Sequence, residues 1–192
     1  MQFFKHIARE MKAGYTLVEV LVVVSIMGIL SSMGVAGLQS AIANARVKDA
    51  AVNTAAFLER VANEARQLSA PICLKISNDS TTLYAIKTAG SDCSASNKTG
   101  SVVDSLIVDS PVRFSENKSQ SCNVQSVDMT TSSNAIFRPR MGLSAVPPEG
   151  VVCVKYGNAD RYGVAQKSKT SNSVKAMWKV GNESGDEGWQ EL

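Results

Sequence analysis

The sequence predicts an α+β fold, in which one long N-terminal helix packs against an antiparallel β-sheet. An unbroken apolar run begins at Tyr15, helical periodicity continues to Pro71, and later segments alternate as strands separated by polar turns. The 192 residues suffice for one ordinary domain and one special segment. The expected parts are a leader over 1–14, an apolar helix over 15–38, an amphipathic helix over 39–70, a β-rich head over 71–180 and a flexible acidic tail over 181–192.

The apolar run over 15–38 is long enough to cross a membrane. It has about 24 residues and would measure roughly 36 Å as a helix. Lys5, Arg9 and Lys12 precede it, so the N-terminus should stay cytoplasmic and the head should be exported. A cleaved secretory signal and a plain anchor are alternatives. Neither explains Glu19 inside the run, because a charge there costs about 2.5–3.5 kcal/mol unless it is paired or reaches the membrane interface.

The start of this run carries a specific motif. Gly14-Tyr15-Thr16-Leu17-Val18-Glu19, followed by the apolar helix, resembles the class III signal of type IV pilins and type II secretion pseudopilins. The resemblance implies that a prepilin peptidase cleaves between Gly14 and Tyr15 and that the new amine of Tyr15 is methylated. It also implies that Glu19 pairs with the terminal amine of a neighbouring subunit. Tyr15 stands where Phe is commonest, and the apolar helix lacks a central proline.

This resemblance predicts a pilin fold and a structural role. The protein would be a single-pass protein of the bacterial inner membrane with a periplasmic head, later built into a pseudopilus or pilus. Its partners would be other pilins or pseudopilins, contacted through apolar helices, and the peptidase transiently. No cofactor is expected.

The amphipathic stretch over 39–70 continues the helix. Its apolar residues fall near i, i+3, i+4 and i+7 spacing, which indicates one buried stripe. They are Val47, Ala51, Ala55, Leu58, Val61, Ala62, Ala65 and Leu68. The abundance of alanine favours a helix, and Pro71 should end it. We expect the stripe to pack on a sheet; the alternative is a self-associating coiled coil.

Strand patterns follow Pro71. Polar residues 77–80 separate the first two expected strands, and Gly157-Asn158 is a hairpin turn signal. The strong candidates are 72–76, 82–86, 151–156, 162–166 and 174–180, and the weaker ones are 102–108, 123–128 and 134–138.

The order of these elements also resembles the H-type minor pseudopilins of type II secretion and related minor pilins. Ala135-Ile136-Phe137-Arg138-Pro139-Arg140-Met141-Gly142 is similar to their I-x-F-x-P-x-G phrase, although the spacing between Pro139 and Gly142 differs by one residue. The glycine that commonly precedes the last strand is replaced by Ser171-Asn172-Ser173. This resemblance implies a minor subunit that serves protein export; a minor type IV pilin for pilus initiation, adhesion, motility or DNA uptake is the alternative.

The cysteines favour disulfides. All four, Cys73, Cys93, Cys122 and Cys153, follow the apolar run, and no two have the spacing of a metal knuckle or a redox pair. In an exported head they would form disulfides with three connectivities open. We favour Cys73–Cys93 with Cys122–Cys153. Four buried free thiols are the alternative for a reducing compartment.

Catalytic chemistry is not indicated. The one histidine, His6, lies in the leader, and no glycine-rich phosphate loop is present. We therefore expect no enzyme and no metal site, and a calcium site at Glu183, Asp186 and Glu187 lacks the ligand spacing of a known loop.

One charge pattern is open to two interpretations. Basic residues interleaved with aromatic ones gather between 131 and 180 and could contact the phosphates of DNA. The candidate residues are Arg138, Arg140, Lys167, Lys169, Lys175 and Lys179. The alternative is a solvated strand face with the aromatic side chains in the core.

Overall fold

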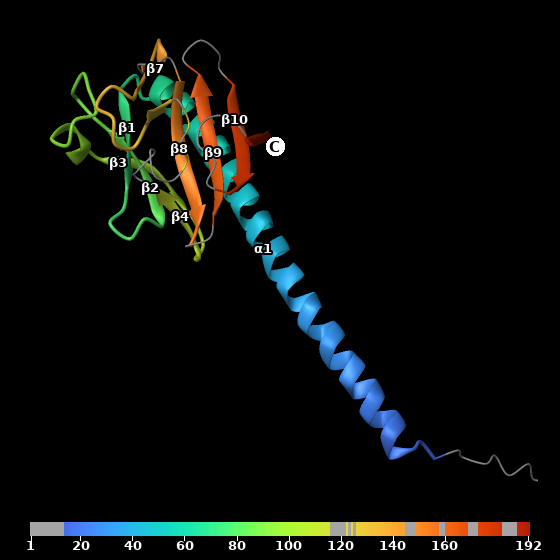
Figure 1. Ribbon diagram of the computed structural model, residues 1–192. Helices are drawn as coiled ribbons and strands as arrows, with labels where there is room; N and C mark the ends of the chain where they lie inside the picture. The colour runs from blue at the N-terminus through green and yellow to red at the C-terminus, as the bar shows by residue number, and fades with distance from the viewer. Residues whose placement is uncertain are drawn as a thin grey trace, which may run out of the picture. The chain divides into compact units, whose positions relative to one another are not determined.

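The computed structural model confirms the α+β class, with one long helix and antiparallel sheets (Figure 1). The structure describes residues 14–115, 122, 124, 126–144, 149–157, 160–168, 173–181 and 188–192. The chain forms two compact units that divide after Ala41. The first unit contains the N-terminal half of the helix, and the second contains the remaining helical turns and all strands.

Helix α1 runs from Leu17 to Gln67. The hydroxyl of Thr16 accepts a hydrogen bond from the backbone N–H of Glu19 at 3.2 Å, as a helix N-cap does. At the other end Ser69 takes a left-handed φ of 48°, and Pro71 follows. The single helix predicted over both the apolar and amphipathic stretches is therefore present, and its last turn ends just before the expected residue 70.

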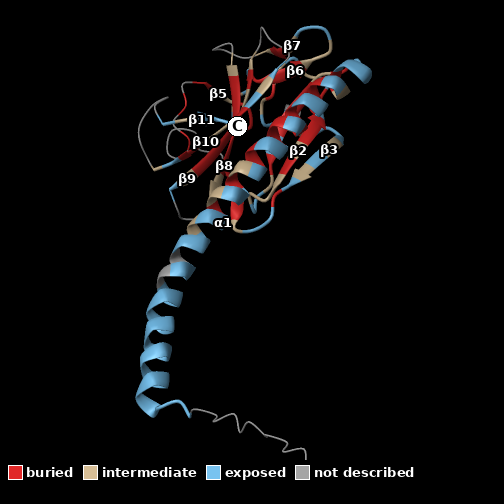
Figure 2. Ribbon diagram, turned by 90° about the vertical axis from the view of Figure 1, so that its right-hand side faces the viewer, coloured by how far each residue is buried: buried red, intermediate tan, exposed pale blue. Residues whose placement is uncertain are grey.

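In the first unit, α1 exposes its apolar side chains on every side. Those from Leu17 to Leu38 that the structure describes are exposed, as the pale blue ribbon in Figure 2 shows. A helix that is apolar all round needs a lipid or protein environment. Among the described residues, α1 is the helix that is long and apolar enough to cross a membrane.

In the second unit, α1 buries the predicted stripe. Ala51, Leu58, Val61 and Ala65 have no exposed surface and belong to the main hydrophobic core, which also contains residues of both sheets. Val47 is fully buried as well, whereas Leu68, just beyond the end of α1, is 38% exposed and is not part of the buried stripe. The expectation that this stripe packs on a sheet is confirmed. Figure 2 shows the buried strands facing these helical turns.

The first sheet has the order β3-β2-β1-β6-β7. All of its neighbouring strands are antiparallel. Its strands are β1 (Ile72–Ile76), β2 (Thr82–Lys87), β3 (Val102–Ile107), β6 (Ile136–Arg138) and β7 (Gly142–Ser144). A short 3-10 helix, η1 (Asn97–Thr99), lies in the connection between β2 and β3. The phrase over 135–142 thus forms the hairpin β6–β7, in which Gly142 has the positive φ of 68° that glycine tolerates.

The second sheet has the order β11-β10-β9-β8-β4. Its strands are β4 (Val112–Ser115), β8 (Glu149–Tyr156), β9 (Arg161–Ser168), β10 (Val174–Val180) and β11 (Gln190–Glu191). The two-residue strand β5 (Val127–Asp128) pairs in parallel with β8. Gly157, with φ of 50°, begins the predicted turn between β8 and β9, while Asn158 lies outside the described residues.

Three strands, β4, β7 and β11, were not predicted from the sequence. The correction matters most for the tail, because residues 190–191 pair with β10 instead of being flexible. Trp189 packs against the buried cluster that contains Tyr162 and Val164, and the N–H of Leu192 donates to the carbonyl of Ala176 at 2.9 Å. A large aromatic side chain with apolar surface to cover thus holds the end of an otherwise acidic, glycine-containing segment.

Close approach between α1 and β9 depends on Gly163. A Cβ atom added there would lie 3.0 Å from the Cβ of Ala51, 3.0 Å from the carbonyl oxygen of Val47 and 2.8 Å from a methyl of Val154. Small residues at this crossing let the helix lie close to the sheet. The backbone contact cannot be relieved by turning a side chain.

We expect Gly163→Ala to destabilise the head by about 1–3 kcal/mol, because an added methyl group overpacks a core that is already filled. Thermal unfolding of the full chain in detergent measures the effect. Gly28→Ala is the matched control, since its new Cβ meets nothing within 4 Å. Equal melting temperatures for the two variants would contradict the close approach.

Candidate assembly site

The junction between Gly14 and Tyr15 lies just before α1 in backbone without regular secondary structure. Tyr15 is 81% exposed, and nothing lies within 4 Å of where a side chain at Gly14 would begin. A peptidase could therefore bind this peptide bond without unfolding a helix. The leader residues 1–13, His6 among them, lie outside the described residues.

Glu19 lies in the first turn of α1. Its carboxylate is close to the helix N-terminus, where the aligned peptide dipoles favour a negative charge. The side chain is exposed, so it is available to a second chain.

Three polar contacts attach α1 to the head near residues 44–48. Arg161 Nε donates to Asn44 Oδ1 at 2.7 Å, and Arg46 Nη1 donates to the carbonyl oxygen of Ser110 at 3.3 Å. The ammonium of Lys48 lies 3.8 Å from the ring centre of Trp178, within the range of a cation–π interaction. These contacts and the main hydrophobic core join this part of the helix to β9, to β10 and to the connection before β4.

Sequence reasoning missed these attachment residues. Arg161 and Trp178 fall within the basic and aromatic stretch over 131–180, and Asn44, Arg46 and Lys48 fall within the predicted amphipathic helix over 39–70, but no contact was predicted for any of them. Local pattern carries no signal for such pairs, because the two members of the Arg161–Asn44 bond are 117 residues apart.

The disulfides join Cys73 to Cys93 and Cys122 to Cys153. This is the pairing that we favoured from the sequence. The first ties β1 to the connection between β2 and β3, and the second ties residue 122 to β8. Both lie in buried clusters, and the described residues contain no free cysteine.

The predicted basic surface is not formed as one face. Lys167 and Lys179 are only 3% and 2% exposed, so neither lies on a DNA-facing surface. Lys167 faces α1, where burial lowers its pKa and Glu59 acts in the opposite direction. Lys179 lies 4.8 Å from the ring centre of Trp189. The physical reason for the correction is that the long apolar stems of these two lysine side chains pack inside the head and do not extend from its surface.

The remaining members of the basic set lie apart. Arg138 and Arg140 belong to the β6–β7 hairpin of the first sheet, whereas Lys175 lies on β10 of the second and pairs with Glu191 at 3.2 Å. Lys169 lies outside the described residues, as do Glu183, Asp186 and Glu187 of the predicted acidic tail. Within the described part of the chain, no three His, Cys, Asp or Glu side chains are placed to hold a metal ion.

An exposed Gly–aromatic junction, a glutamate in the first turn, an apolar helix and a β-rich head are together the features of a type IV prepilin-like protein. The family model of the prokaryotic N-terminal methylation motif matches residues 10–35, which include Gly14, Tyr15 and Glu19. The chain therefore carries the N-terminal segment of the pilin and pseudopilin class, whose members are structural proteins. No curated protein and no solved structure gives a significant match to the chain.

Proposed function

We propose that this protein is a minor pseudopilin, a structural subunit of the filament that drives protein export in type II secretion. The observation that carries the proposal is the methylation motif at the start of a long apolar helix whose later turns are built into the core of a head. The hairpin over 136–144, formed by the phrase that resembles the H-type subunits, supports the choice of a minor pseudopilin.

The proposed route begins in the inner membrane. The basic leader stays in the cytoplasm and the head lies in the periplasm, where its disulfides form. Prepilin peptidase cleaves after Gly14, and Tyr15 is then methylated. The apolar helix leaves the lipid and packs among the helices of other subunits, while Glu19 meets a neighbour's terminal amine. The contacts at Asn44, Arg46 and Lys48 would transmit movement of the helix to the head.

A minor type IV pilin is the second candidate. The exposed Arg140, beside Arg138 on the β6–β7 hairpin, favours it if the host system takes up DNA. Phosphate contacts would make DNA affinity fall steeply with rising salt. If the purified protein did not bind DNA at low salt, a role as a DNA-uptake pilin would be excluded.

Deletion of the gene tests the proposed export role. We expect a set of enzymes to remain in the periplasm of the mutant and to return to the medium when the wild-type gene is restored. Restoration with a variant that retains the leader, such as Gly14→Val, is the matched control and should fail. Unchanged secretion in the deletion strain would overturn the export role and favour the pilus.

The intact mass of the membrane-extracted protein tests the class independently of the host system. Loss of residues 1–14 and addition of one methyl group are expected. An unprocessed mass, or cleavage after the apolar segment, would contradict a prepilin.

A further inference from the structure

A groove of about 390 Å³ lies on the face of the first sheet that points away from α1. Lys75 and Tyr84 face each other in the β1–β2 ladder and alternate with Leu74, Leu83 and Ala85, which belong to the core shared with α1. The groove residues used below are Lys75, Tyr84, Lys98 and Val102. We refer to it as the lysine groove.

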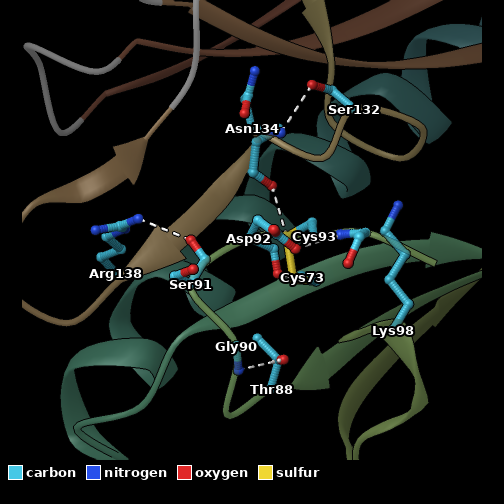
Figure 3. The surroundings of a disulfide bond; sticks show 12 residues. Cys73, Thr88, Gly90, Ser91, Asp92, Cys93, Lys98, Ser132, Asn134 and Arg138 are labelled. Carbon is cyan, nitrogen blue, oxygen red and sulfur yellow. Dashed lines mark hydrogen bonds between the residues drawn. A yellow bond between two sulfur atoms is a disulfide. The ribbon is translucent and has the colours of Figure 1, made fainter. Parts of the chain in front are cut away.

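One wall of the lysine groove is bonded to neighbouring parts of the head at several points. It is the connection between β2 and β3, which is joined to β1 by the Cys73–Cys93 disulfide (Figure 3). Arg138 Nη2 donates to the carbonyl oxygen of Ser91 at 2.9 Å. The N–H of Cys93 donates to the carbonyl oxygen of Ser133 at 2.7 Å. Lys98 Nζ also donates to the carbonyl oxygen of Thr130. A preformed wall lowers the entropy lost when a ligand binds.

The charge inside the lysine groove is positive. Lys75 and Lys98 contribute ammonium groups, and no carboxylate is among the lining residues that the structure describes. The hydrogen bond from Lys98 to a carbonyl leaves its charge in place. Asp79 lies in the turn at one end, where its carboxylate accepts hydrogen bonds from Ser77 and Thr81, which lower its pKa to about 2. The groove therefore suits carboxylates along its length and not at the Asp79 end.

The lysine groove opens at the edge of the sheet. Val102, which lines it, is the first residue of β3, and in the described part of the chain β3 pairs with β2 alone. Val102 and Ile107 are 55% and 68% exposed on this strand. A six-residue edge strand presents backbone N–H and C=O groups that another extended chain can pair with.

We propose that the lysine groove and the β3 edge bind an extended, acidic segment of a partner protein. Its backbone pairs with β3, and its carboxylates, which all lie on one face of the added strand, meet Lys75 and Lys98 on the face that also presents Tyr84 and Val102. Within the described part of the chain the β3 edge pairs with β2 alone, which favours a polypeptide over an acidic polysaccharide, because a polysaccharide could use the lysines but not the backbone. The inference does not depend on whether a secretion system or a pilus hosts the subunit.

Fluorescence anisotropy of the full-length protein in detergent tests this assignment. The probe is a fluorescein-labelled heptapeptide of alternating glutamate and valine. We expect saturable binding that weakens with salt, and at least about tenfold weaker binding when glutamine replaces glutamate. Methylation of alternate backbone nitrogens on the edge that faces β3 should weaken binding similarly, because it removes the donors needed for strand pairing.

Matched charge reversals locate the site. Lys75→Glu should weaken binding about tenfold, whereas Lys87→Glu, an exposed position on β2 outside the groove lining, should change it less than about twofold. No binding at millimolar protein, equal effects of the two reversals, or equal binding of the N-methylated peptide would each overturn the proposal. Binding of oligogalacturonate without binding of the peptide would also overturn it and would identify a polysaccharide site. These measurements use purified protein, so their failure is separate from any secretion phenotype.

Discussion

Glu19→Ala should be cleaved and methylated normally but should enter filaments at least about tenfold less than wild type. Cleavage depends on the exposed junction at Gly14–Tyr15, which the substitution leaves intact. Assembly is different, because the amine at Tyr15 of a neighbour would then be transferred into the apolar helical core without its counter-charge. Removal of one member of a buried ion pair costs about 3–5 kcal/mol.

Two measurements on the same cells separate these steps. Intact mass of membrane extracts reports processing, and the sheared filament fraction reports incorporation. Glu19→Gln keeps the size of the side chain and removes its charge, so it should fail like the alanine variant. Glu64→Gln, later on the same helix, should assemble normally. Normal incorporation of Glu19→Ala would show that the carboxylate has no role in assembly.

Removal of the Cys122–Cys153 disulfide should destabilise the head by about 3–4 kcal/mol, which lowers its melting temperature by on the order of 10 °C. The bond closes a sequence separation of 31 residues and constrains the unfolded chain. It also joins the cluster that contains Val151, Tyr162 and Val164. The Cys122→Ala/Cys153→Ala double variant removes the bond without adding a buried hydroxyl group.

Calorimetry with and without a reducing agent provides the comparison. The double variant should melt about midway between wild type and the protein with both disulfides reduced, because its Cys73–Cys93 bond remains. The Cys73–Cys93 bond closes a separation of 20 residues. The Cys73→Ala/Cys93→Ala variant, which removes this bond, should therefore lose slightly less stability than the Cys122→Ala/Cys153→Ala variant. If the double variant and wild type had the same melting temperature under oxidising conditions, a stabilising role for the bond would be contradicted.

Long-range pairing accounts for what sequence patterns missed. The short strand β7 exists because a three-residue connection and Gly142 return the chain beside β6. The parallel pairing of β5 with β8 has no local signal. Lys167 is buried because its side of β9 faces α1, and Lys179 is buried because its side of β10 faces Trp189. The number of basic residues in a stretch does not indicate which of them face inward.

By itself, the sequence determined the long helix, its apolar first half, most strands and the junction at Gly14, Tyr15 and Glu19. These features are local: hydrophobic periodicity, proline and glycine positions and one contiguous motif specify them. Only the tertiary structure decided the division into two sheets, the docking of Trp189, the attachment of Asn44 to Arg161 and the lysine groove. Each of these requires residues far apart in sequence to meet, and their meeting depends on strand register and on the packing of the whole core.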